Sequence, residues 1–249
     1  MIEVKHLFKS YDGNYVLNDV SASFIQGKCN LIIGRSGSGK TVLLKSIAGL
    51  LEVDEGEIWF GEQKFSHLDM KGRQAIRKEI GMLFQGGALF DSLTVEENVM
   101  FPLDMLTSQP RTTKLDRVNF CLDRVRVKNV NSLYPAELSG GMRKRVAIAR
   151  AIALNPKYLL ADEPNSGLDP ETGIVIDNLI KELTEEFNMT TIINSHDMNS
   201  VLEIGDHVLY IYKGCLCWEG TRDEVLHTDN EALNNFVFAT NMAKRLKNQ

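Results

Sequence analysis

The stretch GRSGSGKT, Gly34–Thr41, decides the fold of this chain, because it fits the spacing G-x-x-x-x-G-K-S/T. The segment before it, CNLII, predicts a buried strand, and residues 42–51 after it predict a helix. In a strand–loop–helix unit of this kind, glycines let backbone N–H groups wrap around phosphate groups. A glycine turn that only caps a helix is the alternative, and the strand and helix on either side favour the phosphate loop.

Two side chains at the end of this loop, Lys40 and Thr41, have different expected roles. Lys40 is expected to reach the β- and γ-phosphates of a nucleotide, and Thr41 is expected to bind Mg²⁺. The predicted cofactors are therefore ATP and Mg²⁺. The other loop residues expected to contact the phosphates are Gly34, Arg35, Ser36, Gly37, Ser38 and Gly39.

A second apolar strand, YLLADE, ends in two acidic residues. An acid at the end of a parallel strand beside a phosphate loop is well placed to hold Mg²⁺, and we assign this role to Asp162. Glu163 is then free to orient or deprotonate the attacking water. An apolar run ending in two acids is common by itself, but together with the phosphate loop it predicts nucleotide hydrolysis.

A second phosphate-binding stretch opens ELSGGMRKRVAIARA, residues 137–151. Ser139, Gly140 and Gly141 stand at a predicted helix start, where N–H groups and the positive end of the helix dipole favour phosphate. No lysine follows at the spacing of the first loop. A two-fold dimer explains both stretches, because the first loop of one chain and the serine–glycine turn of the other would enclose one nucleotide. The basic residues that follow are expected to be solvated or to face the partner: Arg143, Lys144, Arg145 and Arg150.

Strands and helices alternate along most of the chain, which predicts a parallel sheet with crossover helices. Residues 94–153 differ, because they predict helices with loops at Gln109–Pro110 and Tyr134–Pro135. This block is interpreted as a helical subdomain inserted into the α/β core. The other helices are expected at 42–51, 66–79, 171–187 and 198–205, and a last one in the tail.

Composition limits the class of protein. The chain has 249 residues, of which 43% are hydrophobic. Its formal net charge of -5 disfavours nucleic acid as a partner, because proteins that bind nucleic acid more often have a basic excess. Its N-terminus lacks the apolar core of a signal peptide, and its apolar runs are far shorter than the ~20 residues of a membrane span. We expect a soluble cytoplasmic protein. Cys215 and Cys217 are expected on one side of a strand, where ordinary packing is favoured over a metal or a disulfide.

Three motifs together resemble the nucleotide-binding subunit of an ABC transporter: GRSGSGKT, LSGGM and YLLADEP. The resemblance covers nearly the whole chain and implies a P-loop NTPase (RecA-like) core with an antiparallel β subdomain and an inserted α-helical subdomain. It implies one ABC ATPase domain over residues 1–249. Its parts would be a core with the β subdomain at 1–93 and 154–229, the helical signature subdomain at 94–153 and a helical tail at 230–249.

The resemblance also assigns residues that would be weak candidates alone. Tyr11 is similar to the aromatic residue that stacks on adenine, and Gln85 resembles the glutamine near Mg²⁺ that reports the site to the helical subdomain. Asp169 lies in SGLDP, which resembles the loop at the dimer contact. His196 in NSHD resembles the histidine that senses the γ-phosphate.

The family's usual signature ends in glutamine, whereas Met142 stands in this chain. Together with LSGGM, the stretch LFQGGALFDSLTVEENVMFPL resembles the ATPase of Mla-type phospholipid transporters, which work with Mce-domain lipid-binding proteins. The resemblance implies a homodimer, separate membrane permease subunits and a peripheral place on the cytoplasmic face of the inner membrane. The permease is expected to contact some members of an apolar group, the others being core: Ala88, Leu89, Phe90, Val99, Met100 and Phe101.

The sequence also allows other functions to be considered. The chain could serve an importer or exporter of another small substrate. An ABC ATPase without a permease, acting on DNA or ribosomes, usually has long coiled-coil insertions or two cassettes, and this sequence has neither. A non-catalytic regulator is disfavoured because Lys40, Asp162, Glu163 and His196 are all present.

Overall fold

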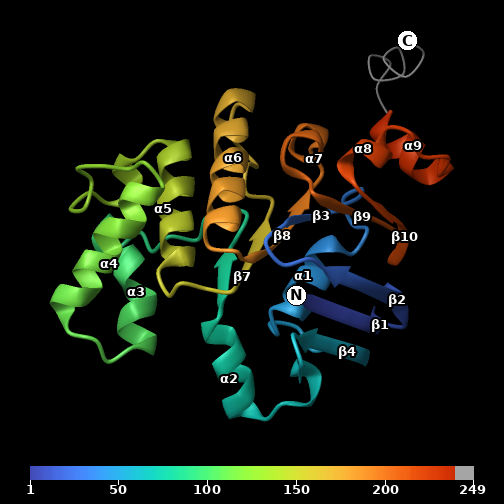
Figure 1. The fold of residues 1–249 in the computed structure, drawn as a ribbon, viewed down its shortest axis with the longest axis horizontal. Helices are drawn as coiled ribbons and strands as arrows, with labels where there is room; N and C mark the ends of the chain where they lie inside the picture. The colour runs from blue at the N-terminus through green and yellow to red at the C-terminus, as the bar shows by residue number, and fades with distance from the viewer. Residues whose placement is uncertain (239–249) are drawn as a thin grey trace.

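The computed structural model describes residues 1–238, which form two sheets and their covering helices (Figure 1). Five strands of the larger sheet are parallel and the sixth, at one edge, is antiparallel. In spatial order its strands are β10 (Cys215–Gly220), β9 (His207–Tyr212), β3 (Cys29–Ile33), β8 (Thr190–Ser195), β7 (Tyr158–Asp162) and β6 (Ile80–Leu83).

The central strands are buried on both faces, as expected for a parallel sheet whose crossover helices cover it. Every residue of β3, β7 and β8 is buried. In β3, Leu31 and Ile33 pack into one hydrophobic core, while Ile32 packs into a second core on the opposite face. Helix α1 (Lys40–Ile47) follows β3, α6 (Pro170–Glu186) follows β7, and α7 (Met198–Ile204) follows β8. Helices α8 (Arg222–Val225) and α9 (Glu231–Val237) follow the edge strand β10.

A smaller antiparallel sheet comes from the N-terminal part of the chain and shares the second core with α1. Its hydrophobic residues alternate with exposed ones, so one face of the sheet is buried. In spatial order it holds β2 (Asn14–Phe24), β1 (Ile2–Tyr11), β4 (Glu55–Phe60) and β5 (Gln63–Lys64), followed along the chain by the 3₁₀ turn Phe65–His67 and α2 (Met70–Lys78).

A helical block lies between β6 and β7 in sequence and to one side of the large sheet in Figure 1. Thr94 and Glu97 form a capping box that starts its first helix: the threonine hydroxyl accepts from the backbone of Glu97, whose carboxylate accepts from the backbone of Thr94. The block holds α3 (Val95–Leu106), α4 (Arg111–Arg124), the 3₁₀ turn Pro135–Glu137 and α5 (Gly140–Ile152). The predicted α/β architecture with inserted helices is confirmed.

Strand β10 and helix α9 differ in detail from the elements that the sequence predicts. The register of β10 shifts between Leu216 and Trp218, so the simple alternation expected for Cys215 and Cys217 is interrupted there. All four cysteines are free thiols. Of the expected helical tail, 230–249, the structure describes α9, whereas residues 239–249, which include Lys244, Arg245 and Lys247, lie outside the described residues.

Candidate functional site

The phosphate loop joins β3 to α1, and close backbone contacts require its glycines. A Cβ atom on Gly34 would lie 2.3 Å from the carbonyl oxygen of Ile211. Gly39 has a φ of 107°, and a Cβ there would lie 2.6 Å from the carbonyl oxygen of Val16. Helix α1 begins directly after Gly39, which has no side chain to cap it, and such a helix start presents its first N–H groups to an anion.

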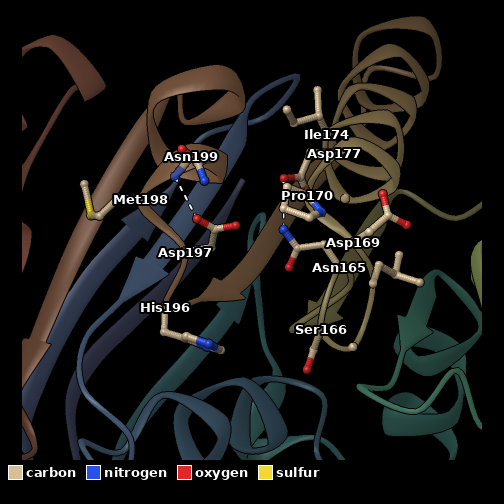
Figure 2. Close-up of a pocket in the computed structure, with 13 residues that line it drawn as sticks. Asn165, Ser166, Asp169, Pro170, Ile174, Asp177, His196, Asp197, Met198 and Asn199 are labelled. Carbon is tan, nitrogen blue, oxygen red and sulfur yellow. Dashed lines mark hydrogen bonds between the residues drawn. The ribbon is translucent and has the colours of Figure 1, made fainter.

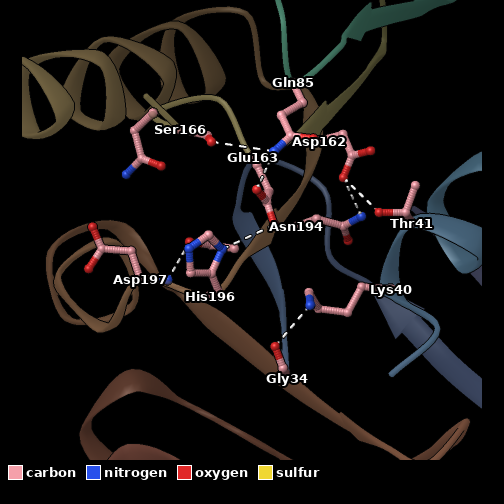
Figure 3. A network of polar contacts seen from close by, with 12 residues as sticks. Gly34, Lys40, Thr41, Gln85, Asp162, Glu163, Ser166, Asn194, His196 and Asp197 are labelled. Carbon is pink, nitrogen blue, oxygen red and sulfur yellow. Dashed lines mark hydrogen bonds and ion pairs between the residues drawn. The ribbon is translucent and has the colours of Figure 1, made fainter. Parts of the chain in front are cut away.

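Lys40 lies across this loop rather than extending into solvent (Figure 3). Its Nζ donates to the carbonyl oxygens of Gly34, at 2.8 Å, and Arg35, at 3.2 Å. Burial lowers the pKa of Lys40, and the carboxylates of Glu163 and Asp162 oppose this shift. The ammonium therefore lies over the loop, close to both acidic residues, where it can bind the terminal phosphates of a nucleotide.

Oxygen ligands suited to Mg²⁺ meet beside the loop (Figure 3). Thr41 Oγ1 donates to Asp162 Oδ1 at 3.2 Å, and Asn194 Nδ2 donates to the same oxygen at 3.0 Å. In the described part of the chain, two buried oxygens near this point have no hydrogen-bond partner: Asn194 Oδ1 and Ser38 Oγ. The Asp162 carboxylate and the Thr41 hydroxyl, which contact each other, are oxygen ligands of the kind that Mg²⁺ binds. The two oxygens without a partner could accept hydrogen bonds from water bound to that ion.

Glu163 is held from two sides by residues of separate loops (Figure 3). Gln85 Nε2 donates to Glu163 Oε2 at 2.8 Å, and His196 Nδ1 lies 3.0 Å from Glu163 Oε1. Glu163 has a φ of 48°, a left-handed conformation that costs energy for a residue with a Cβ, and its N–H donates to the Asn194 carbonyl. The predicted residues Gln85, Glu163 and His196 are thus brought together next to the phosphate loop.

The serine–glycine turn lies elsewhere in the molecule. Ser139 caps α5, with its Oγ accepting from the Met142 N–H at 3.2 Å. A Cβ on Gly141 would lie 2.8 Å from Thr172, so glycine lets the turn approach α6. The turn lines a cavity of about 490 Å³ together with residues 167–169, and none of the described residues 34–41 lines it. The serine–glycine turn and the phosphate loop of one chain therefore lie apart.

Two more predicted residues occupy exposed positions. Tyr11 lies at the end of β1, 46% exposed, with the Lys9 ammonium 5.4 Å from its ring centre. Asp169 caps α6, accepting from the Thr172 N–H at 2.9 Å, and its hydrogen bonds to Thr172 lower the pKa of its carboxyl. Both side chains have surfaces open to a ligand or a partner.

The interpretation of two basic residues of α5 as solvated or partner-facing is wrong. Lys144 is buried and donates to the carbonyl oxygen of Gln85. Arg150 donates to the carbonyls of Gly87, at 2.7 Å, and Ala88, at 2.8 Å. These bonds satisfy the backbone of the loop after β6, so α5 and the loop that carries Gln85 are joined directly.

Asn194 is a residue beside Asp162 that the sequence analysis did not single out. It stands in β8, next to the last residue of the strand. A fully buried asparagine one position from the end of a parallel strand is the signal that could have identified it, because a buried amide needs partners.

Residues 17–166 match the ABC transporter family. The chain belongs to that family. It is 39% identical over 237 residues to the intermembrane phospholipid transport system ATP-binding protein MlaF of Haemophilus influenzae, covering 95% of this chain and 90% of that protein. It is 38% identical to the methionine import ATP-binding protein MetN of Campylobacter jejuni, covering 95% of this chain and 75% of that protein.

Solved structures agree with this assignment. The dimeric ATP-binding cassette MJ0796, in a post-hydrolysis state bound to ADP and Pi, superimposes with a TM-score of 0.81 at 34% identity, covering 89% of this chain and 99% of that one. The ABC protein described here is accordingly an ATPase that binds ATP with Mg²⁺. Subunits of this family work as dimers with membrane permeases, and the matched cassette is itself dimeric.

Replacing Asn194 by alanine should weaken the metal site. The Asn194→Ala chain loses the donor that holds Asp162 Oδ1, and loss of such an outer partner typically costs roughly 10–100-fold in metal affinity. We expect the Mg²⁺ concentration for half-maximal ATPase activity to rise by about tenfold. Thr191→Val, a buried change on the same strand away from Asp162, is the control. An unchanged Mg²⁺ requirement in Asn194→Ala would contradict this role.

Proposed function

We propose that this ABC ATPase drives a separate membrane permease that moves phospholipid. The observation that carries the proposal is the stretch Leu83–Leu103 with the LSGGM signature, which resembles the Mla-type subgroup. The 39% identity to MlaF supports it, since that protein is described as part of an intermembrane phospholipid transport system. A Mce-domain lipid-binding protein is then an expected partner in the same complex.

Two chains would share two nucleotides in this proposal. The loop 34–41 of one chain cradles the phosphates, with Lys40 on the β- and γ-phosphates, and the Ser139–Gly141 turn of its partner covers the γ-phosphate. The separation of these halves within one chain supports the arrangement. Tyr11 stacks on the adenine ring, and Asp169 lies at the contact between the chains.

The catalytic residues act on the attacking water. Glu163 orients the water and accepts its proton, while His196 and Gln85 hold the carboxylate from either side. Thr41 and Asp162, with Gln85 nearby, are the residues that would hold Mg²⁺, which neutralises the charge of the phosphates when it is bound. Lys40, already close to both acids, stabilises the same developing charge.

The permease would dock in an apolar cavity between the core and the helical block. This cavity of about 380 Å³ lies beside the loop that follows β6. Phe90 and Phe101 line it with their ring centres 4.7 Å apart, and both rings are more than a third exposed. Of the apolar group considered from the sequence, Val99 and Met100 belong to the hydrophobic core instead.

The place of docking suits communication with the nucleotide. Arg150 lines the same cavity and donates to the loop carbonyls next to Gln85. A permease helix that presses on this cavity would therefore act on the segment that holds Glu163.

We propose that residues 1–93 and 154–229 form the nucleotide-binding part, 94–153 the permease-facing part and 230–249 a tail. Among residues 1–238, no helix combines the length and apolar composition that a membrane crossing requires. We propose, from the resemblance to ABC transporter subunits, that the chain lies at the cytoplasmic face of the inner membrane, bound through the permease.

A second candidate is transport of another small substrate, which the 38% identity to the methionine import protein favours. Purification from membranes through a tag on this chain separates the two. We expect an integral permease, a Mce-domain protein and enriched phospholipid by mass spectrometry. Recovery of an amino-acid or sulfate permease without lipid-binding protein would refute the phospholipid proposal and leave the ATPase assignment in place.

Glu163→Gln should retain ATP binding and lose turnover. A general base contributes about 10²–10⁴ in rate, so we expect at least a hundredfold lower hydrolysis in the complex. The variant should also accumulate as an ATP-bound dimer, detectable by light scattering. Lys40→Ala is the comparison, since it should weaken both binding and hydrolysis. Wild-type turnover in Glu163→Gln, or a monomeric ATP complex, would contradict the proposed mechanism.

Phe101→Asp should separate the ATPase from its permease. The side chain is exposed in the docking cavity, so a carboxylate there disturbs the partner more than the fold. We expect loss of permease in tag purification, while the free chain still binds ATP. Phe120→Asp, an exposed phenylalanine on α4 that does not line this cavity, is the matched control. Equal permease recovery from both variants would rule the cavity out as the docking site.

A further inference from the structure

Asn165 and Asp177 line a cavity of about 420 Å³ (Figure 2), and both are hydrogen-bonded to Ser200 of α7. Asp177 of α6 accepts at its Oδ2 from Asn165 Nδ2, at 3.1 Å, and from Ser200 Oγ of α7, at 2.7 Å. Asn165 Nδ2 also donates to Ser200 Oγ at 2.9 Å. We call these three residues the Asp177 cluster.

The geometry fixes the direction of each bond in the Asp177 cluster. A serine hydroxyl has one proton to donate, and a carboxylate only accepts. Because Ser200 donates its proton to Asp177, its lone pairs are left to accept from Asn165. The carboxylate therefore orients the hydroxyl that joins α7 to the segment of Asn165.

The cluster joins the two segments that hold the catalytic carboxylate. Asn165 comes two residues after Glu163, and Ser200 comes four residues after His196. His196 and Glu163 contact each other directly at 3.0 Å. The Asp177 cluster is a second connection between the same two segments.

Asp177 is poorly suited to a purely structural role. It is 3% exposed, and in the described chain its Oδ1 has no hydrogen-bond partner. Burial raises the pKa of Asp177 to about 6, with Asp197 and Glu203 adding to the shift and the bonds from Ser200 and Asn165 opposing it. A carboxyl whose folded pKa exceeds its unfolded value lowers stability as pH rises toward that folded pKa. At pH 8 the fold therefore carries a buried charge that an apolar side chain would avoid.

We propose that Asp177 is a positioning residue for hydrolysis, which holds the Glu163 segment and the His196 segment in register by orienting Ser200. This inference rests on the proposed roles of Glu163 and His196 in ATP hydrolysis. The side chain of Asp177 accepts hydrogen bonds from Asn165 and Ser200. It acts through Asn165 and Ser200, and the consequence of losing it is a misplaced catalytic pair.

The test separates positioning from stability. Asp177→Leu removes both bonds and the buried charge, while Asp177→Asn keeps an acceptor oxygen for Ser200 and Asn165. In the purified complex at pH 8 we expect Asp177→Leu to lower kcat roughly tenfold and to leave KM for ATP unchanged. The reason is that a misplacement of a catalytic group by about 1 Å can lower the rate up to 10²-fold. Its melting temperature should equal or exceed that of the wild type. Asp177→Asn should restore kcat.

Two further variants test the same connection without relying on Asp177→Leu alone. Ser200→Ala is a small change that breaks the link to α7, so it should lower kcat by a similar factor even if Asp177→Leu fails to fold. The double variant should be no worse than either single one, because both changes break one connection. Thr184→Val, a buried polar change on α6 away from the site, is the control that loses stability and keeps kcat.

Wild-type kcat in Ser200→Ala, or a kcat loss that follows the melting temperature as in the control, would overturn the positioning role. Glu163→Gln in the same assay tests the proposed function separately. If that variant hydrolyses ATP normally, the assignment of Glu163 fails, whereas the Asp177 inference fails only through its own variants.

Discussion

The register of three parallel strands is the constraint on which the rest of the site depends. Asn194 of β8 pairs with Asp162 of β7 on one side and with Ile32 of β3 on the other. Parallel strands end at the same edge, so this register brings the phosphate loop, the two acids and the histidine segment to one place. A slip of one residue would turn Asp162 toward the opposite face of the sheet and remove it from Thr41.

The phosphate loop and the serine–glycine turn of a single chain lie in separate places. Its phosphate loop has glycines at every close contact, a lysine across the loop and oxygen ligands for a metal, whereas its serine–glycine turn lies in another cavity. Lys144 and Arg150 join the helix of that turn to the carbonyls around Gln85. Helix α5 is thus hydrogen-bonded to the loop that carries Gln85, and Gln85 in turn donates to Glu163.

Local motifs explain why much of this could be predicted from the sequence. The phosphate loop and the strand ending in Asp162 and Glu163 are contiguous, and their residue types follow from the chemistry of phosphate and Mg²⁺. The interactions of Lys144, Asn194 and Asp177 were not predicted, because each joins residues far apart in the chain. A lysine among arginines on a helix suggests a solvated surface until the carbonyl it contacts is known. The places of Gln85 near Mg²⁺ and of His196 at the γ-phosphate were suggested by family resemblance, since neither residue is distinctive by its own spacing. Their contacts with Glu163 were not predicted.

The left-handed backbone of Glu163 has an evolutionary consequence. A residue with a Cβ costs about 1–2 kcal/mol in that conformation, and glycine or asparagine would relieve most of it. Mutational drift toward a more stable chain would therefore favour those two residues at position 163, and each would remove the carboxylate. A glutamate at position 163 therefore keeps its carboxylate beside the phosphate loop at the expense of backbone stability.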